Sequence, residues 1–239
     1  MNCKKVAESK PDGFINIFNG KNLENWEGDP TYWRVQNGIL VGEIIPETLL
    51  KRNTFIIWKG GAPSNFELKL DFKISDKGNS GINYRSSLID TLPFALKGYQ
   101  GDIDGSNRYT GMNYEERGRT TLAPRGQKVI VNSQPNPESE NSLKNNIVSN
   151  AWQSSEILAS LGNQDSLLNY IKDNDWNTFH IIAKNNRLQH FVNGKLMSDV
   201  TDNDSLNRKQ SGFIGVQVHT GPPMKVEFKN IQLKTLNSE

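Results

Sequence analysis

The sequence predicts an all-β protein, and three observations support this prediction. The 239 residues include 20 Gly, 10 Pro, 5 Trp, 6 Tyr and 10 Phe, a composition that fits short strands and tight turns better than a helical bundle. Residues 66–74 alternate strictly between apolar and polar side chains, as expected of a strand with one buried and one wet face. Asn-Gly pairs at 19–20, 37–38 and 193–194 favour tight turns between strands. The length allows one large β domain with a sizeable core.

The net charge and the single cysteine limit the possible partners and sites. The chain has 28 basic and 26 acidic residues, so its charge of +2 produces no strong field, and we expect no nucleic-acid partner. Cys3 alone cannot form an internal disulfide or a cysteine zinc site, and no segment approaches transmembrane length.

The N-terminal segment suggests a membrane tether. The residues before Cys3 include no apolar stretch and therefore no complete signal peptide. If the chain is trimmed, Cys3 is the lipid-bearing first residue of a bacterial lipoprotein, and residues 1–11 form a flexible tether before a single domain at 12–236. The protein would then be periplasmic or exposed at the cell surface. The alternative is an ordinary cytosolic N-terminus.

The first half of the chain predicts a β-meander. Phe14, Ile15, Ile17 and Phe18 anchor a first strand that ends at the turn pair 19–20. Residues 32–44 then form two strands joined at Asn37-Gly38, and residues 54–58 form a compact apolar strand before the alternating one.

The second half returns to β structure after an irregular region. We expect a strand at 128–131 and a polar surface loop at 135–146. Residues 151–172 predict a short helical insertion of two turns, broken at Gly162-Asn163, that packs over a sheet edge. Ser154 or Ser155 would cap the first turn and Asp165 the second.

Four strands, the last with a bulge, are predicted in the C-terminal part of the chain. Turns at Asn185-Asn186 and Asn193-Gly194 connect strands within residues 176–197. In the final strand the apolar residues change parity at Lys229-Asn230, which predicts a β-bulge.

Four conspicuous aromatic side chains receive structural assignments. We assign Trp26 and Trp33 to packing in or around the core. His180 and His190 lie within strands, with no carboxylate or cysteine at ligand spacing, and are interpreted as satisfied sheet histidines.

One stretch, residues 98–119, has polar residues where a core strand would be apolar. It reads GYQGDIDGSNRYTGMNYEERGR, and Asp102 and Asp104 share one face. Tyrosines and arginines beside carboxylates and amides suit sugars, because rings stack on pyranose faces and polar groups bind hydroxyls. A solvated hairpin of mixed charge is the alternative.

Residues outside this stretch extend the candidate site. Arg85 follows a polar turn, where it can pair with Asp102 or Glu116 and donate to an oxygen-rich ligand, or form a purely structural ion pair. Gln217 and His219 share the polar face of a later strand, and His219 adjoins the loop TGPP, a position typical of functional residues on a scaffold.

Six blocks of the sequence together resemble one protein family. They are GFINIFNGKNLENW, NFELKLDFKISDKGNSGINYRS, GYQGDID, YEERGR, WNTFHIIAKNNRLQHFVNGKLM and GFIGVQVHTGPPMKVEFKNIQL. Over about residues 12–236 the chain resembles the 3-keto-disaccharide hydrolase domain family. The resemblance implies a jelly-roll β-sandwich of the concanavalin A-like lectin/glucanase type. It also implies secreted or periplasmic proteins that act on glycosides oxidised at C3.

The resemblance and the residue pattern together give a set of expected site residues, of which Arg85 and His219 match family positions. Many members have Glu where this chain has Gln100, so acid-base chemistry would pass to Asp102 or Glu116. The expected catalytic residues are Asp102, Glu116 and His219. The expected substrate-binding residues are Tyr84, Arg85, Gln100, Tyr114, Arg119 and Gln217.

A 3-keto group suggests a specific chemistry, because it acidifies the hydrogen at C2. Proton abstraction there can eliminate the C1 substituent, with water added afterwards. We assign His219 or Asp102 as base, Glu116 as acid, and Arg85 with Gln100 as donors. A divalent metal on Asp102, Glu116 and His219 is a further possibility, although the spacing gives no ligand signature.

Alternative functions remain open at this point. A direct two-carboxylate glycosidase is the nearest, but the E-x-D-x-x-E pattern of laminarinase-like sandwiches is absent. The stretch from Asp102 fails as an EF-hand, because Asn107 and Asn113 occupy the required Gly and Glu positions. A non-catalytic glycan-binding module and a purely structural surface protein are the alternatives outside the enzymes.

Overall fold

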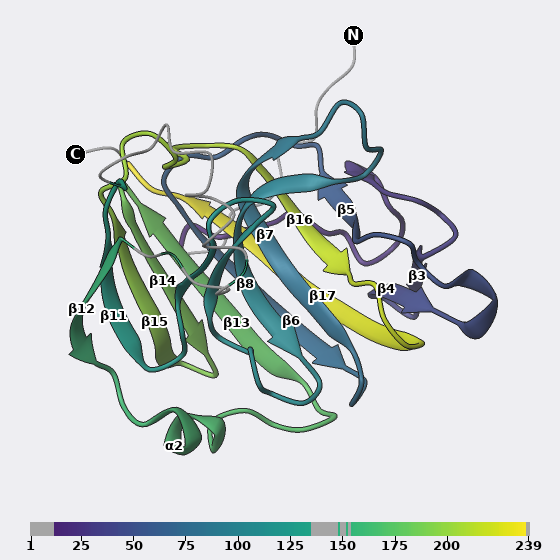
Figure 1. The fold of residues 1–239 in the computed structure, drawn as a ribbon. Helices are drawn as coiled ribbons and strands as arrows, with labels where there is room; N and C mark the ends of the chain where they lie inside the picture. Colours follow the sequence, from purple (N-terminus) through teal and green to yellow (C-terminus); the bar gives the residue numbers. More distant parts are fainter. Residues whose placement is uncertain (1–11, 135–147, 149–151, 153, 238–239) are drawn as a thin grey trace, which may run out of the picture.

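The computed structural model describes residues 12–134, 148, 152 and 154–237. Two β-sheets pack face to face, which confirms the predicted all-β sandwich (Figure 1). The ten-stranded sheet has the order β12-β11-β15-β14-β13-β6-β17-β4-β3, with β1 also paired to β17. The seven-stranded sheet has the order β10-β9-β8-β7-β16-β5-β2. The pairing is antiparallel except between β11 and β15.

The strands differ widely in length. Those of the ten-stranded sheet are β1 (Ile15–Asn16), β3 (Trp33–Gln36), β4 (Ile39–Ile44), β6 (Phe66–Ile74), β11 (Gln127–Val131), β12 (Ser155–Ser160), β13 (Asn177–Lys184), β14 (Arg187–Val192), β15 (Lys195–Asp202) and β17 (Met224–Thr235). Those of the seven-stranded sheet are β2 (Trp26–Glu27), β5 (Thr54–Trp58), β7 (Asn79–Leu88), β8 (Leu96–Asp104), β9 (Asn113–Glu116), β10 (Thr120–Ala123) and β16 (Phe213–Val218). Among the described residues, the helical elements with defined bounds are η1, a 3₁₀ turn (Pro46–Thr48), and α2 (Gln164–Leu168), which lies at one end of the sandwich (Figure 1).

The core lies between the sheets and receives side chains from both. In β6 the buried and half-buried residues alternate without a break, as the sequence predicts. Phe66 of this strand meets Tyr84 of β7 edge-on, with ring centroids 6.0 Å apart. Trp26 and Trp33 are also buried, which confirms their assignment to packing. One continuous apolar cluster therefore joins the two sheets.

The predicted turns and bulge in the later strands are confirmed. Asn37-Gly38 joins β3 to β4 and Asn193-Gly194 joins β14 to β15, and all four residues have positive φ, as type I′ hairpins require. Asn185-Asn186 joins β13 to β14. Asn230 has a φ of 53° where the pairing of β17 with β6 changes register.

The first predicted hairpin is wrong. β1 covers only Ile15–Asn16 and pairs with β17 at the other end of the chain. Asn19 does not begin a strand-to-strand turn, because its Oδ1 accepts hydrogen bonds from the backbone N of Lys21 (2.8 Å) and of Asn22 (3.0 Å). This local Asx turn satisfies the backbone without a partner strand.

The first half of the predicted helical insertion is also wrong. Residues 155–160 form β12, which pairs with β11 at the sheet edge, so the available pairing partner outweighs local helix propensity. The second half is the helix α2, but Asn163 and not Asp165 is its N-cap, accepting from the backbone N of Asp165 and of Ser166. The polar loop at 135–146, and Cys3 with the tether, lie outside the described residues.

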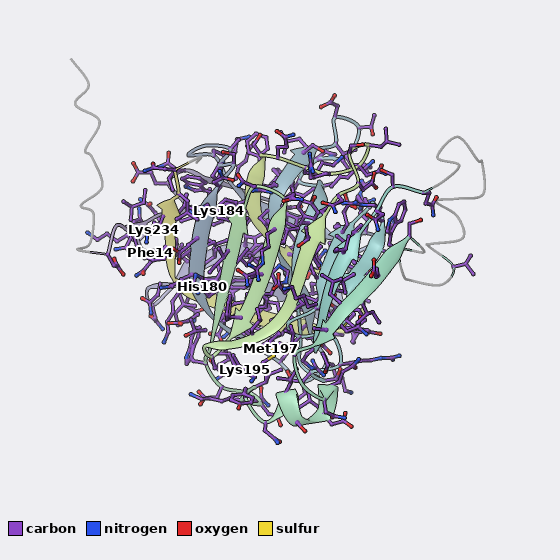
Figure 2. All side chains as sticks on the ribbon, turned by 90° about the vertical axis from the view of Figure 1, so that its left-hand side faces the viewer. Phe14, His180, Lys184, Lys195, Met197 and Lys234 are labelled. Carbon is purple, nitrogen blue, oxygen red and sulfur yellow. The ribbon has the colours of Figure 1, made fainter. Side chains whose placement is uncertain are left out.

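Both strand histidines have structural partners, which confirms their assignment. His180 lies on the outer face of the ten-stranded sheet, 2.9 Å from Glu67, a carboxylate that sequence spacing did not reveal (Figure 2). His190 is buried and contacts the Tyr84 hydroxyl (2.8 Å) and the Met112 carbonyl (3.0 Å). In the part of the chain that the structure describes, no helix is long and apolar enough to cross a bilayer.

Candidate active site

A cavity of about 660 Å³ opens on the face of the seven-stranded sheet that points away from the core. The sheet register explains why polar residues gather there. Gln100 pairs with Tyr114 and Gly98 with Glu116, so Gln100, Tyr114 and Glu116 share one face. Tyr99 points to the core instead. The cavity is lined by Lys51, Arg52, Asn53, Asn79, Gln100, Asp102, Tyr109, Tyr114, Glu116, Arg117, Gly118, Thr120, Thr121, His219 and Thr220.

A glycine makes room for the central amide. Gly81 of β7 pairs with Asp102 of β8. A Cβ atom on Gly81 would lie 2.3 Å from Cδ of Gln100, so the Gln100 side chain crosses the position where another residue would carry its side chain. Gln100 in turn accepts a 3.3 Å hydrogen bond from Nε2 of Gln217 and donates through Nε2 to Oδ1 of Asp102 at 2.7 Å.

Asp102 is a buried carboxyl group with no cation beside it among the described residues. Burial is the main cause that raises the pKa of Asp102 to about 8; the nearby Asp104 and Glu116 carboxyl groups contribute to the rise, and the hydrogen bond from Gln100 only partly offsets it. At neutral pH Asp102 is therefore mostly protonated and able to donate a proton.

Glu116 shares the cavity in a more polar setting. Its Oε1 accepts a hydrogen bond from Nδ2 of Asn53 (3.3 Å) and lies 3.7 Å from Nε of Arg117. Burial raises the pKa of Glu116 in spite of the opposing effects of Asn53, Arg117 and His219. Two acids of raised pKa therefore line one cavity, an arrangement common in active sites.

His219 is oriented by the loop that follows β16. Its Nδ1 lies 2.6 Å from the backbone carbonyl of Thr220, and because a carbonyl only accepts, Nδ1 carries the hydrogen. In the neutral ring Nε2 then has a free lone pair and can act as a base. Asn53 holds this loop as well, since its Oδ1 accepts from the backbone N of Thr220 at 3.0 Å. Asn53 thus connects His219 to Glu116.

Asp104 shapes the site without lining it. Its carboxylate accepts hydrogen bonds from the backbone N of Arg108, Tyr109 and Thr110. These bonds fold the loop after β8 so that Tyr109 reaches the cavity wall.

Sequence reasoning missed Asn53, Asn79 and Tyr109 as site residues. Asn53 is adjacent to β5, and only the pairing of β5 with β16 brings it beside the loop after Val218. Asn79 lies in the polar segment that the sequence predicts to be a turn, but it is the first residue of β7 and pairs with Asp104. The tyrosine in the acidic stretch was visible in the sequence, but the loop geometry that brings it to the cavity was not.

Three predicted substrate-binding residues lie elsewhere. Tyr84 belongs to the core face of β7, where its hydroxyl meets His190, so its assignment is wrong. Arg85 does not pair with Asp102 or Glu116. Its φ is 45° and the β7–β8 register shifts after Tyr84, so its side chain leaves the predicted face and donates to the backbone carbonyls of Ser64 and Asn185.

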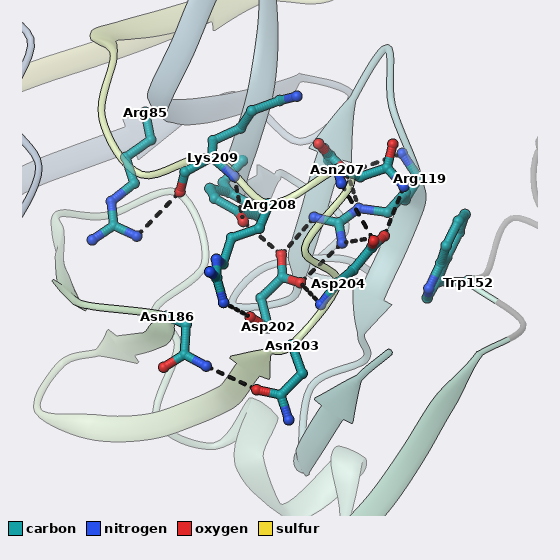
Figure 3. A network of polar contacts seen from close by, with 12 residues as sticks. Arg85, Arg119, Trp152, Asn186, Asp202, Asn203, Asp204, Asn207, Arg208 and Lys209 are labelled. Carbon is teal, nitrogen blue, oxygen red and sulfur yellow. Dashed lines mark hydrogen bonds and ion pairs between the residues drawn. The ribbon is translucent and has the colours of Figure 1, made fainter. Parts of the chain in front are cut away.

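Arg119 is the third correction, because it belongs to a buried ionic cluster (Figure 3). Only 2 % of its side chain is exposed, and it pairs with Glu115, with Asp202 at 2.6 Å and with Asp204 at 3.2 Å. A guanidinium with three carboxylate partners is not available to a substrate. Gln217 is also buried, does not line the cavity, and acts on it through hydrogen bonds to Gln100 and Glu116.

The structure therefore brings Gln100, Asp102, Tyr114, Glu116 and His219 together around one cavity. Within the described ranges no group of three or more His, Cys, Asp or Glu side chains is arranged to hold a metal ion.

These features define a β-sandwich with an acid-lined cavity on one sheet. The model of the 3-keto-alpha-glucoside-1,2-lyase-like domain matches residues 13–234, and the chain belongs to this family. The family predicted from the six sequence blocks is confirmed. No curated protein sequence matches the chain.

Solved structures agree on the fold. One "putative glycosyl hydrolase" from Parabacteroides distasonis is 18% identical with a TM-score of 0.57, over 93% of this chain and 99% of that one. Another from the same organism is 19% identical with a TM-score of 0.57, over 95% of each chain. A beta-glucanase from Bacillus licheniformis is 11% identical with a TM-score of 0.53, over 95% of this chain and 100% of that one. The predicted lectin/glucanase type of jelly-roll sandwich is therefore confirmed.

Proposed function

We propose that the protein is a carbohydrate-active enzyme that cleaves the glycosidic bond of 3-keto-glycosides in the Asp102 cavity. Family membership and the likeness to glycosyl hydrolase structures support the carbohydrate class. The observation that carries the proposal is the combination, in one cavity, of a protonated buried carboxyl group at Asp102 with an available base at Nε2 of His219.

The proposed reaction is an elimination followed by hydration. Nε2 of His219 takes the proton from C2, and that electron pair forms the C1–C2 double bond as the C1–O bond breaks. Asp102 gives its proton to the departing oxygen, and water later adds across the double bond. Burial and the neighbouring acids Glu116 and Asp102 raise the pKa of Tyr114 to about 12, so its hydroxyl stays protonated and can donate to the ketone oxygen.

This proposal reverses part of the assignment made from the sequence. There Glu116 was the acid, and His219 or Asp102 the base. The raised pKa of Asp102 favours it as the acid, and Glu116 then orients the sugar through its remaining oxygen. Direct hydrolysis with Asp102 as acid and Glu116 activating water is the second route that the same residues allow.

Product analysis with purified protein and a 3-keto-glucoside tests the proposal. We expect release of 3-keto-glucose or its 2-hydroxyglucal by NMR, reduced at least about 100-fold by Asp102→Asn and by His219→Ala. Glu67→Gln, on the opposite sheet, is the control and should retain activity. Deuterium at C2 slows elimination but not direct hydrolysis. Runs with and without EDTA decide whether a divalent cation takes part.

The opposite result would favour a different class of protein. Saturable binding of the 3-keto-glucoside without product, weakened but not abolished by Asp102→Asn, would indicate a non-catalytic glycan-binding module. Absence of any binding would contradict both the enzyme hypothesis and the glycan-binding hypothesis.

We also propose that Cys3 carries the lipid of a bacterial lipoprotein, which places the domain in the periplasm or at the cell surface. The support is the position of Cys3 ahead of a polar segment before the sandwich. Mass spectrometry of the N-terminal peptide from the natively expressed protein should show the diacylglyceryl mass on Cys3. An unmodified thiol there would contradict the proposal.

A further inference from the structure

A second cavity, of about 470 Å³, lies away from the Asp102 site. It is lined by Ser64, Asn65, Asn185, Asn186, Arg208 and Gln210. These residues come from the loop before β6, the turn between β13 and β14, and the segment after β15. No residue is shared with the first cavity.

A buried guanidinium lies behind the wall of this second cavity and holds three of its lining residues in place. Arg85 is 1% exposed and donates to the carbonyls of Ser64 (2.8 Å) and Asn185 (2.7 Å) and to Oδ1 of Asn65 (3.3 Å). A fourth bond goes to the carbonyl of Lys209 at 3.3 Å (Figure 3). All four acceptors are neutral, and no described carboxylate lies within ion-pair distance of Arg85. Its positive charge is therefore solvated by dipoles and not cancelled.

A second cation stands beside the first. Nη1 of Arg208 donates to the backbone carbonyl of Asp202 at 3.2 Å, and no described carboxylate pairs with this guanidinium either. The Asp202 carboxylate is already engaged by Arg119. Burial lowers the pKa of Arg85, and the charge of Arg208 opposes its protonation further, as expected for two cations that lie close together.

The rest of the lining supplies groups that recognise hydroxyls. Asn65, Asn186 and Gln210 place amide side chains in the cavity wall together with the Arg208 guanidinium. Amides both donate to and accept from sugar hydroxyls, and a guanidinium matches a carboxylate or sulfate oxygen pair. The volume lies within the range of small-molecule sites.

We propose that this second cavity binds a small acidic saccharide, with its carboxylate or sulfate ester held by Arg208 next to the buried charge of Arg85. A neutral sugar would leave both cations without a counter-charge. The site is separate from the chemistry proposed for the Asp102 cavity and does not depend on it.

Calorimetric titration of the full chain with glucuronate, glucose 6-sulfate, glucose and inorganic sulfate tests this proposal. We expect the two acidic sugars to bind at least about tenfold more tightly than glucose or inorganic sulfate. Arg208→Gln should weaken their binding at least tenfold. Gln210→Glu should do the same by charge repulsion, and since no hydrogen bond involves the exposed Gln210 side chain in the described structure, this variant leaves the fold intact.

Two control variants test whether binding takes place in the second cavity and not in the first. Arg34→Gln removes a cation that pairs with Glu43 on β4, and Asp102→Asn alters the first cavity, so neither should change the affinity. Unchanged binding in Gln210→Glu, or loss of binding in Asp102→Asn, would overturn the assignment of the site. Inorganic sulfate binding as tightly as glucuronate would overturn the saccharide part of it.

Discussion

Two neighbouring glutamates of β9 are both buried, yet they occupy opposite electrostatic environments. Glu115 is 1% exposed on the core side, where Oε2 accepts from Nε and from the backbone N of Arg119. Glu116 is 7% exposed on the cavity side, where its nearest cation, Arg117, is 3.7 Å away at the rim. Burial alone therefore does not mark a functional acid. The cavity differs from the ionic cluster because the cation beside Glu116 is distant and partly exposed, so that burial still raises the pKa of Glu116.

Replacing Arg119, the cation of the buried ionic cluster, should produce the largest change in stability. Arg119→Met leaves the carboxylates of Glu115, Asp202 and Asp204 buried without their partner, and we expect the free energy of unfolding to fall by about 3–5 kcal/mol. Urea denaturation measures this loss. Arg117→Met, two positions earlier and at the cavity rim, should cost no more than about 0.5 kcal/mol. Equal losses would show that the two regions do not differ.

Replacing Asp102, the cavity acid, by a neutral residue should raise the free energy of unfolding at pH 7, whereas replacing Arg119 lowers it. The folded-state pKa of Asp102, about 8, lies above its ordinary value of 3.8, so its contribution to stability is complete below pH 4 and is lost as the pH rises to 8. Asp102→Asn should remove a slope of up to about 1.4 kcal/mol per pH unit in that window and stabilise the protein at pH 7. Denaturation at several pH values measures it, with the exposed Asp90→Asn as control. A variant less stable than the parent at pH 7 contradicts this prediction.

The space beneath Gln100 allows a smaller, structural test. Gly81→Ala places a Cβ against Gln100, and we expect a cost of about 1–3 kcal/mol in unfolding free energy together with slower turnover, because Asp102 loses its donor. Combining it with Gln100→Ala removes the clashing atoms, so the double variant should recover part of the stability but not the activity. Additive losses of stability in this double-mutant cycle would argue against the contact.

Replacing Arg117, the cation at the cavity rim, should produce the smallest effect, a change in the pKa of Glu116. Arg117 lowers the pKa of Glu116, so Arg117→Gln should raise that pKa. Carboxyl-carbon NMR titration of Glu116 measures the shift directly. Arg34→Gln, which is remote, should leave it unchanged, and a downward shift after Arg117→Gln would contradict the prediction.

The same contrast explains which parts of the molecule the sequence could predict. The strand at 66–74 was predictable because a single buried face imposes a period of two. Parity also placed Asp102 with Asp104, and Gln217 with His219. Parity failed at Arg85, because its positive φ and the register shift after Tyr84 redirect the side chain. A β-bulge of this kind interrupts the alternation without leaving an apolar pattern that the sequence could reveal.

Partners that are distant in the chain explain the remaining errors. Arg119 resembles a sugar-binding arginine until Asp202 and Asp204, more than 80 positions later, are placed beside it. Residues 155–160 form a strand only because β11 offers an edge. In both cases the deciding interaction is tertiary, so local composition carried no information about it.

The position of β17 has a consequence for how the chain is made. This strand lies between β4 and β6, so those two strands lack their shared neighbour until residues 224–235 have left the ribosome. Nascent chains would expose two unpaired edges next to the apolar face of β6, a state prone to association with other chains. The sandwich therefore closes late in synthesis, and chains truncated before Met224 should depend on chaperones to remain in solution.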